Sequence, residues 1–470
     1  MNKFIVNIFL YFFGVLVFFS CSSVTDNQKQ EEADFVSHQS SENFLTGKLI
    51  EKVFCKNDSS QSYSLYLPST YSSIKKYPVL FFFDPHADGK LPLLKYQSLA
   101  ERYGFIFVGS NNSKNGLQRK QSDAIVRTFI IDVLNRVRAD SSKIFVAGFS
   151  GGARVAGMAP IQYGIISGAI GCSAGMSSQS NQIYPPFVGI AGEEDMNYLE
   201  MVINDEQMKK KKVPHLLLTF EGKHEWSPEN SFEEALLFLL LNNMKEKKIS
   251  TDTMVVNRFI AMSDSVISEC KKQKNIINEY LGLVIKTECL AGLIDVSVEE
   301  KKIADFLQNK QFLMAVEKKQ KLLQQEYFLQ QNFRNLFDSL DINSISVELK
   351  KLEHPKNEDE RKMFVRVKGY LSLLSYSYSS RLIDQTEQEM VTEKILSIYK
   401  LVDPKNSEHA YLSACLSAKK GNQKKAITFL LEAVSLGFSD VNRLENDNYF
   451  LSMKTDTEFK NLCDKIRVKK

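Results

Sequence analysis

The 470-residue sequence predicts an α/β class, in which a doubly wound, mainly parallel sheet is followed by an all-α region. Up to about residue 246, short runs of consecutive apolar residues alternate with helical patterns, as in a parallel sheet covered on both faces. From about residue 247 the strand signals vanish and long helical patterns take over. A chain of this length exceeds one ordinary core, so two or three domains are expected.

The first 20 residues are expected to be a targeting signal and not part of the fold. Lys3 precedes an apolar run over residues 4–19, which is too short for a comfortable membrane span. The run ends at Ser20-Cys21 and resembles a bacterial lipoprotein signal. That resemblance implies cleavage before Cys21 and lipid attachment to this residue; an uncleaved N-terminal anchor is the alternative. Residues 21–43 are polar and predict a flexible tether that holds the body at the periplasmic or surface face of a bacterial cell envelope.

Residues 44–246 are expected to form the α/β unit. Residues 47–54 and 63–67 alternate with period two, which is typical of an antiparallel pair. Helical patterns are expected over 93–102, over 121–138 and directly after Ser150. The further strands are predicted at 78–83, 105–108, 144–147, 166–172, 187–191 and 216–220.

The segment Gly148-Phe149-Ser150-Gly151-Gly152 fits the pattern G-x-S-x-G. About one chain in ten of this length and glycine content would contain such a match by chance, and an ordinary serine in a glycine-rich turn is the alternative. Ser150, however, follows a predicted strand and precedes a predicted helix. A nucleophile elbow requires this placement, because it exposes the serine at a helix N-terminus. The sequence therefore predicts Ser150 as a nucleophile.

A serine hydroxyl needs a general base, and the chain has only six histidines. His224 lies just beyond the last predicted strand, which fits the chain order Ser–acid–His. The acid should follow the penultimate strand, where Glu193, Glu194 and Asp195 are adjacent. Asp195 is the preferred acid, to orient the imidazole and stabilise its protonated form, and the two glutamates remain alternatives.

An oxyanion hole needs backbone N–H groups that point at the developing charge. Gly151, directly after the serine, is expected to supply one of them. The turn after residues 78–83 should supply the other, and Pro85 has no N–H, which leaves His86 or Ala87. His86 is the preferred second donor.

Five segments in this order carry a resemblance to a known family: LYLPSTY, YPVLFFFDPHADG, VAGFSGGARVA, GIAGEEDMNY and GKHEWSP. They resemble the α/β-hydrolase superfamily, and within it lidless esterases similar to dienelactone hydrolase, feruloyl esterase and poly(3-hydroxybutyrate) depolymerase. The resemblance implies hydrolysis of a small ester or acyl substrate through an acyl-enzyme, without metal or organic cofactor. Peptidase or acyltransferase chemistry would use the same triad. These relatives usually carry an HG-type turn that supplies an oxyanion donor. This chain has FDPHADG at that place, so the resemblance does not extend to the residue that supplies the second donor.

Composition excludes other classes of function. A formal net charge of +4 gives no nucleic-acid footprint. The six cysteines beyond Cys21 are scattered, without C-x-x-C pairs or metal-ligand spacing, so no zinc site is predicted. Disulfides and buried free thiols both remain open.

Residues 247–470 are expected to form a helical domain. Within it, residues 407–438 resemble one tetratricopeptide repeat, and the stretch after them resembles the cap that ends such arrays. A generic helical bundle is the alternative. A repeat surface would bind a protein or peptide. The whole chain is thus expected to be a membrane-anchored serine hydrolase; the alternative is a non-catalytic scaffold lipoprotein that uses a degenerate hydrolase fold.

Overall fold

The computed structural model describes residues 42–176 and 184–468. The predicted signal, Cys21 and almost all of the tether lie outside the described residues. The first half of the chain forms one eight-stranded sheet with the order β1-β2-β4-β3-β5-β6-β7-β8. Its strands are β1 (Leu49–Phe54), β2 (Ser62–Tyr66), β3 (Tyr77–Phe83), β4 (Ile106–Ser110), β5 (Ala139–Phe149), β6 (Gly168–Cys172), β7 (Phe187–Gly192) and β8 (His215–Phe220). Its helices are α2 (Lys90–Tyr103), α3 (Arg119–Arg136), α4 (Gly151–Gln162), α5 (Tyr198–Lys210) and α6 (Glu229–Lys245).

The sheet is mixed, and its antiparallel part lies at one edge. β1 pairs with β2 and β2 with β4 in antiparallel fashion, whereas the remaining neighbours are parallel. The antiparallel opening pair and the α/β class expected from the sequence are thereby confirmed. β5 starts five residues before the predicted strand, because Ala139 already pairs with Tyr77 ahead of an irregularity in the register. In parallel pairing the carboxyl ends of β5, β7 and β8 lie at the same edge of the sheet, which brings their following loops together.

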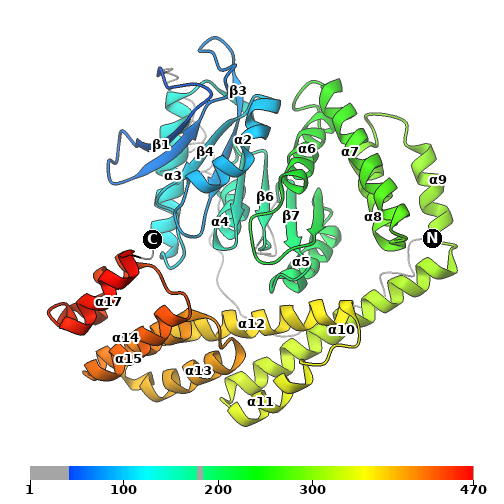
Figure 1. Cartoon of the computed structure of the whole chain (residues 1–470). Coiled ribbons are helices and arrows are strands. Elements are labelled where there is room, and N and C mark those ends of the chain that lie inside the picture. The colour runs from blue at the N-terminus through cyan, green and yellow to red at the C-terminus, as the bar shows by residue number, and fades with distance from the viewer. Residues whose placement is uncertain (1–41, 177–183, 469–470) are drawn as a thin grey trace, which may run out of the picture.

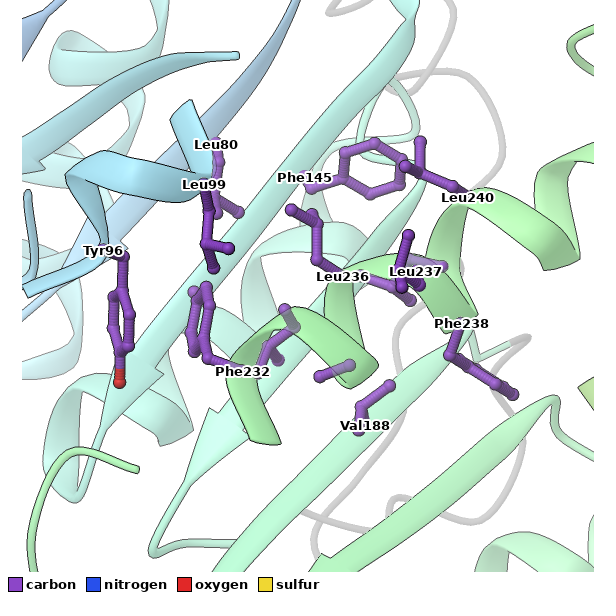
Figure 2. Packing of buried hydrophobic residues seen from close by; sticks show 14 of the residues in the cluster. Leu80, Tyr96, Leu99, Phe145, Val188, Phe232, Leu236, Leu237, Phe238 and Leu240 are labelled. Carbon is purple, nitrogen blue, oxygen red and sulfur yellow. The ribbon is translucent and has the colours of Figure 1, made fainter. Parts of the chain in front are cut away.

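Two apolar clusters cover the two faces of the sheet. Side chains alternate along β3, so that Leu80 and Phe82 enter one cluster while Phe81 and Phe83 enter the other. The first cluster includes α2 and α6, whose Tyr96 and Phe232 rings stack with centroids 3.9 Å apart. Figure 2 shows side chains of this cluster: Leu80, Tyr96, Leu99, Phe145, Val188, Phe232, Leu236, Leu237, Phe238 and Leu240.

The first cluster does not end with the sheet region. α6 is buried around most of its circumference, because one side faces the sheet and another side faces α7 (Thr253–Lys272) and α8 (Ile276–Leu290). Phe259 of α7 and Leu290 of α8 are fully buried in the same cluster as Phe232. The domain boundary predicted at 246/247 therefore falls within continuous apolar packing.

A buried carboxylate adds a polar link at this junction. Glu233 of α6 accepts hydrogen bonds from Arg102 and Tyr103 of α2 and from Arg258 of α7. Burial alone would raise the pKa of Glu233, but the hydrogen bonds from Arg258, Tyr103 and Arg102 outweigh it and lower the pKa to about 2.

Glu233→Gln is expected to lower the free energy of unfolding by about 1–3 kcal/mol at neutral pH, because charge-assisted hydrogen bonds are lost from a buried site. A carboxylate with a depressed pKa stabilises the fold above its unfolded pKa, and the stabilisation is lost as the pH falls towards 2. Urea titrations at several pH values check this. The difference between wild type and variant should shrink below about pH 4.5; a difference that is constant down to pH 2.5 would contradict the assignment.

The second half of the chain is helical throughout its described residues. After α8 come α9 (Ser297–Phe306), α10 (Lys310–Asp338), α11 (Ile342–Lys351), α12 (Glu358–Leu382), η1 (Thr386–Gln388), α13 (Glu389–Val402), α14 (Ser407–Lys419), α15 (Gln423–Ser435), α16 (Val441–Asn446), η2 (Asn448–Met453) and α17 (Thr457–Val468). In Figure 1 these helices form an arc that runs beside the sheet region and then below it, where α12 passes under α5.

Asparagine and aspartate side chains set where many of these helices begin. Each accepts a hydrogen bond from a backbone N–H of the first turn, which satisfies a donor that has no partner within the helix. These N-cap residues are Asp252, Asn275, Asn309, Asp341, Asn357, Asn406, Asn422 and Asp440.

The segment singled out at 407–438 forms the helix pair α14–α15. Gly421 has a φ of 75° in the turn between the two helices, a left-handed conformation that favours glycine. The small and apolar positions Ala414, Ala426, Leu430 and Ala433 are buried together at the contact between the two helices. Among the described residues, no helix combines the length and the apolarity needed to cross a bilayer.

Candidate active site

Ser150 occupies a strained turn between β5 and α4. Its φ and ψ are 52° and −119°, a conformation that non-glycine residues rarely adopt and that is held only where the surroundings impose it. The turn is tight because two glycines permit close approach. A Cβ on Gly148 would lie 2.1 Å from the Gly152 carbonyl oxygen, and one on Gly152 would lie 2.0 Å from the Phe83 carbonyl oxygen. The glycines of the motif thus have a steric role, and the serine lies at the first turn of a helix.

The loops after β7 and β8 bring a histidine and an acid to this serine. His224 Nε2 lies 2.9 Å from Ser150 Oγ, and His224 Nδ1 lies 2.9 Å from Asp195 Oδ1. Asp195 is fully buried, whereas the His224 side chain is about one-fifth exposed. An ionised carboxylate only accepts hydrogen bonds, so the Nδ1 proton of a neutral imidazole faces Asp195 and Nε2 is left to accept from the Ser150 hydroxyl. The three residues selected from the sequence therefore form a continuous hydrogen-bonded chain.

Backbone contacts place Asp195 between the two loops. The Glu193 N–H donates to the Phe220 carbonyl and the Glu194 N–H to the Gly222 carbonyl, both at 2.9 Å, which ties the acid-bearing loop to the histidine-bearing loop. The Asn197 N–H donates to Asp195 Oδ1 at 2.8 Å and orients the carboxylate. The alternatives Glu193 and Glu194 point away from His224 and form ion pairs with α12.

The two predicted oxyanion donors, Gly151 and His86, lie in different structural settings. Gly151 begins α4, where the first N–H groups of a helix have no partner within the helix. The His86 N–H instead donates to Asp84 Oδ1 at 2.8 Å, and the His86 side chain is 81% exposed. In this structure His86 thus departs from its predicted role. The physical reason is an Asx turn, in which an aspartate accepts from the N–H two residues on; Asp84 was the sequence signal for it.

Aromatic side chains lie beside the histidine. The Phe149 ring is 4.8 Å from the His224 ring, centroid to centroid, and the Trp226 ring also packs on Phe149, at 5.7 Å. Trp226 Nε1 donates to Asp84 Oδ2 at 2.9 Å, so the buried Asp84 links the turn after β3 to the histidine loop. Trp226, the sole tryptophan of the sequence, is therefore a packing residue that makes one polar contact.

Sequence reasoning missed Asn115. A Cβ on Gly151 would lie 1.8 Å from Asn115 Oδ1, so the Asn115 side chain covers the residue directly after the nucleophile. The Asn115 N–H donates to the Pro85 carbonyl at 2.9 Å, which fixes this loop against the turn after β3. No sequence signal identified Asn115, because the contact joins two loops that are distant in the chain.

The cysteines beyond Cys21 all lie in the described part of the chain and are unpaired thiols. Burial raises the pKa of Cys172 to about 11, which keeps this thiol next to the site protonated. Within residues 42–176 and 184–468 there is no group of three or more His, Cys, Asp or Glu side chains placed to hold a metal ion.

Neither a protein-family model nor a curated protein sequence matches the chain. Among solved structures, it is similar to S-formylglutathione hydrolase from Staphylococcus aureus, with 12% identity over 42% of this chain and 98% of that one and a TM-score of 0.34. A ferulic acid esterase matches with 16% identity over 42% of this chain and 98% of its own, with a TM-score of 0.34. Est1E from Butyrivibrio proteoclasticus matches with 13% identity over 41% of this chain and 98% of its own, with a TM-score of 0.32.

Proposed function

We propose that the protein is a serine hydrolase of the α/β-hydrolase type that cleaves small carboxylic esters through an acyl-enzyme. The observation that supports this best is the chain Ser150–His224–Asp195 on a strained strand-to-helix turn. A strained serine that a histidine contacts, backed by a buried carboxylate, is the arrangement by which a weakly nucleophilic hydroxyl is activated at neutral pH.

The reaction proceeds in two halves. Ser150 Oγ attacks the acyl carbon while His224 Nε2 takes the hydroxyl proton, and the carbonyl oxygen becomes an oxyanion near the Gly151 N–H. His224 returns the proton to the leaving alcohol as the C–O bond breaks, which leaves Ser150 acylated. Water, deprotonated by His224, then releases the acid and restores the serine. Asp195 stabilises the imidazolium in both halves and stays ionised.

Labelling by a fluorophosphonate tests this function without a known substrate. The wild-type protein is expected to form a stoichiometric phosphonyl adduct at Ser150, since an activated serine displaces fluoride from phosphorus. Ser150→Ala should abolish the adduct, and Ser227→Ala, which changes another buried serine, should leave it intact. Peptide mass spectrometry identifies the labelled residue. A wild-type protein that stays unlabelled at millimolar probe would support a scaffold role instead.

We further propose that the helical region binds a protein or peptide partner. The helix pair α14–α15 has the small residues at its contact that a tetratricopeptide repeat uses, and α16, η2 and α17 pack at its end as a cap would. Such a partner would bring substrate or location to the hydrolase, since a helical-repeat surface binds without performing chemistry.

We propose that lipid on Cys21 anchors the protein at the periplasmic or cell-surface face of a bacterial membrane in the cell envelope. Expressed in bacteria, the protein is expected to incorporate labelled fatty acid and to partition into detergent. Cys21→Ala should remove the label and release the protein into the soluble fraction, whereas Ser22→Ala should change neither property. Label that persists in Cys21→Ala would contradict lipidation at this residue.

A further inference from the structure

The loop that carries Asp195 is held from outside the sheet. We call residues 193–197, between β7 and α5, the acid loop. The Glu193 carboxylate pairs with Lys362 and the Glu194 carboxylate pairs with Arg361, both from α12. Arg366, one turn further along α12, donates through Nη1 to the Glu193 carbonyl oxygen at 2.6 Å. A helix that lies about 170 residues later in the chain thus contacts both residues that precede the acid.

Arg366 is itself fixed on its remaining sides. Its guanidinium forms a bidentate ion pair with Glu326 of α10, with Nε 2.8 Å from Oε1. It also stacks over the ring of Tyr198, the first residue of α5, with 4.6 Å between Cζ and the ring centroid. Arg366 and Glu326 are both almost fully buried. A planar guanidinium with this set of partners has one geometry, so it transmits the position of α10 and α12 to the main chain of the acid loop.

The other side of Asp195 is held by packing. Gly369 of α12 lies against Met196, and a Cβ on this glycine would come within 3.1 Å of Met196 Cβ. Leu323 of α10 packs on a small cluster that flanks the acid loop, with Ala191 before the loop and Tyr198 and Met201 after it. The helices therefore contact residues before and after Asp195, while Asp195 itself contacts His224 and Asn197.

We propose that α10 and α12 position the catalytic acid, with Arg366 as the positioning residue, so that the helical region is part of the hydrolase and not only an appended binding module. The proposal rests on the proposed function. Asp195 acts by orienting and stabilising His224, which requires the carboxylate to stay within hydrogen-bond distance of Nδ1. A loop without its Arg366 contact would sample positions in which that bond is lengthened. Loss of Arg366 would then lower kcat, with little change in KM, because Asp195 does not touch the substrate.

The main experiment replaces the whole buried pair, so that no unpaired charge is left in the interior. Arg366→Met/Glu326→Leu is compared with Arg443→Met/Glu408→Leu, which removes a more exposed arginine–glutamate pair elsewhere in the helical region. Arg443 also forms a bidentate ion pair with its glutamate and stacks over Tyr411 at 4.1 Å, far from the acid loop in sequence. Each double variant is made in the wild-type and in the Asp195→Asn background, and kcat and KM are measured with a short activated ester.

The Arg366 pair variant is expected to lower kcat on the order of 10- to 100-fold in the wild-type background, with KM within about twofold. In the Asp195→Asn background it should cause no further loss, because the residue acts through Asp195. The Arg443 pair variant should leave kcat unchanged in both. Equal losses for the two pairs, or a loss that persists in Asp195→Asn, would overturn the proposal.

Two further measurements test the proposal if the Arg366→Met/Glu326→Leu variant does not fold or if the wild-type protein has no hydrolase activity. Gly369→Ala introduces a better helix former into α12 and adds a methyl group that presses on Met196, so it should lower kcat several-fold only when Asp195 is present. The downfield proton resonance of the His224 Nδ1–H bonded to Asp195 reports position without any substrate. It should weaken or shift in the Arg366 pair variant and in Gly369→Ala, but not in the Arg443 pair variant. If Ser150-dependent hydrolysis is absent from the wild type, the proposed function fails and this resonance alone decides; an unchanged resonance in both α12 variants overturns the positioning role.

Discussion

Ser150→Ala and His224→Ala are each expected to lower kcat/KM for a short activated ester by about 10⁴- to 10⁶-fold. Both residues contact the transferred proton, so removal of either one stops the activation of the nucleophile. The 2.9 Å contact between His224 Nε2 and Ser150 Oγ already has the length of a functional hydrogen bond, and no rearrangement of the loops is needed to form it.

The double variant Ser150→Ala/His224→Ala should be little worse than either single variant, since the two residues act as a unit. His215→Ala is the matched control, because His215 also faces an acid, with Nε2 3.4 Å from Asp205 Oδ1, at the opposite end of β8. It should keep most of the activity. Multiplicative losses in the double variant would argue against a coupled pair. Wild-type rates in both single variants would contradict the catalytic roles and support the non-catalytic scaffold.

The elbow and the histidine were predictable because their signals are local. Gly148 and Gly152 lie on either side of Ser150 at a strand end, and the distances to neighbouring main-chain atoms show that both positions require glycine. His224 follows the strand that neighbours β7, so chain order and strand order together bring its loop to the serine.

The acid and the second oxyanion donor were harder, for two different reasons. Three adjacent acids follow β7, and which of them turns inward depends on Arg361 and Lys362 of α12, whose place beside the loop no local pattern indicates. The position of His86 after a strand predicts a backbone donor there, but the nearby Asp84 side chain competes for that N–H and accepts its hydrogen bond. In both cases a side-chain interaction determines which group faces the site. The Asp84–His86 interaction is local in the sequence, whereas the contacts between the glutamates and α12 are not.

In the helical region, too, local sequence patterns predict the helices but not how they are arranged. Asparagine and aspartate caps together with apolar spacing make its helices visible in the sequence, and the pair α14–α15 lies where a repeat was predicted. The direction of α12 across the acid loop is set by buried contacts such as Arg366 with Glu326, which are 40 residues apart. Pairing at that separation cannot be read from the pattern of one chain.

Asp195→Asn is expected to lower kcat for the same ester by about 10³- to 10⁴-fold, less than the loss of Ser150 or His224. The amide keeps the shape of the side chain but can donate a hydrogen bond to Nδ1. This favours the tautomer whose proton lies on Nε2 and faces the serine. The imidazolium formed during acyl transfer also loses the buried negative charge 2.9 Å from Nδ1 that stabilises it.

The two neighbouring glutamates provide matched controls for the acid. Glu193→Gln and Glu194→Gln remove one negative charge each from the same loop, and both carboxylates face α12 rather than His224. Their losses in kcat should stay below about tenfold, because Arg366 still holds the Glu193 carbonyl oxygen, which neither substitution alters. Rates for the three single variants at one pH, together with a thermal melt of each, decide between the acids. Of the three acids, only Asp195 directly contacts the imidazole in the structure. A loss for Glu193→Gln or Glu194→Gln as large as that for Asp195→Asn would therefore contradict the assignment of Asp195 as the acid.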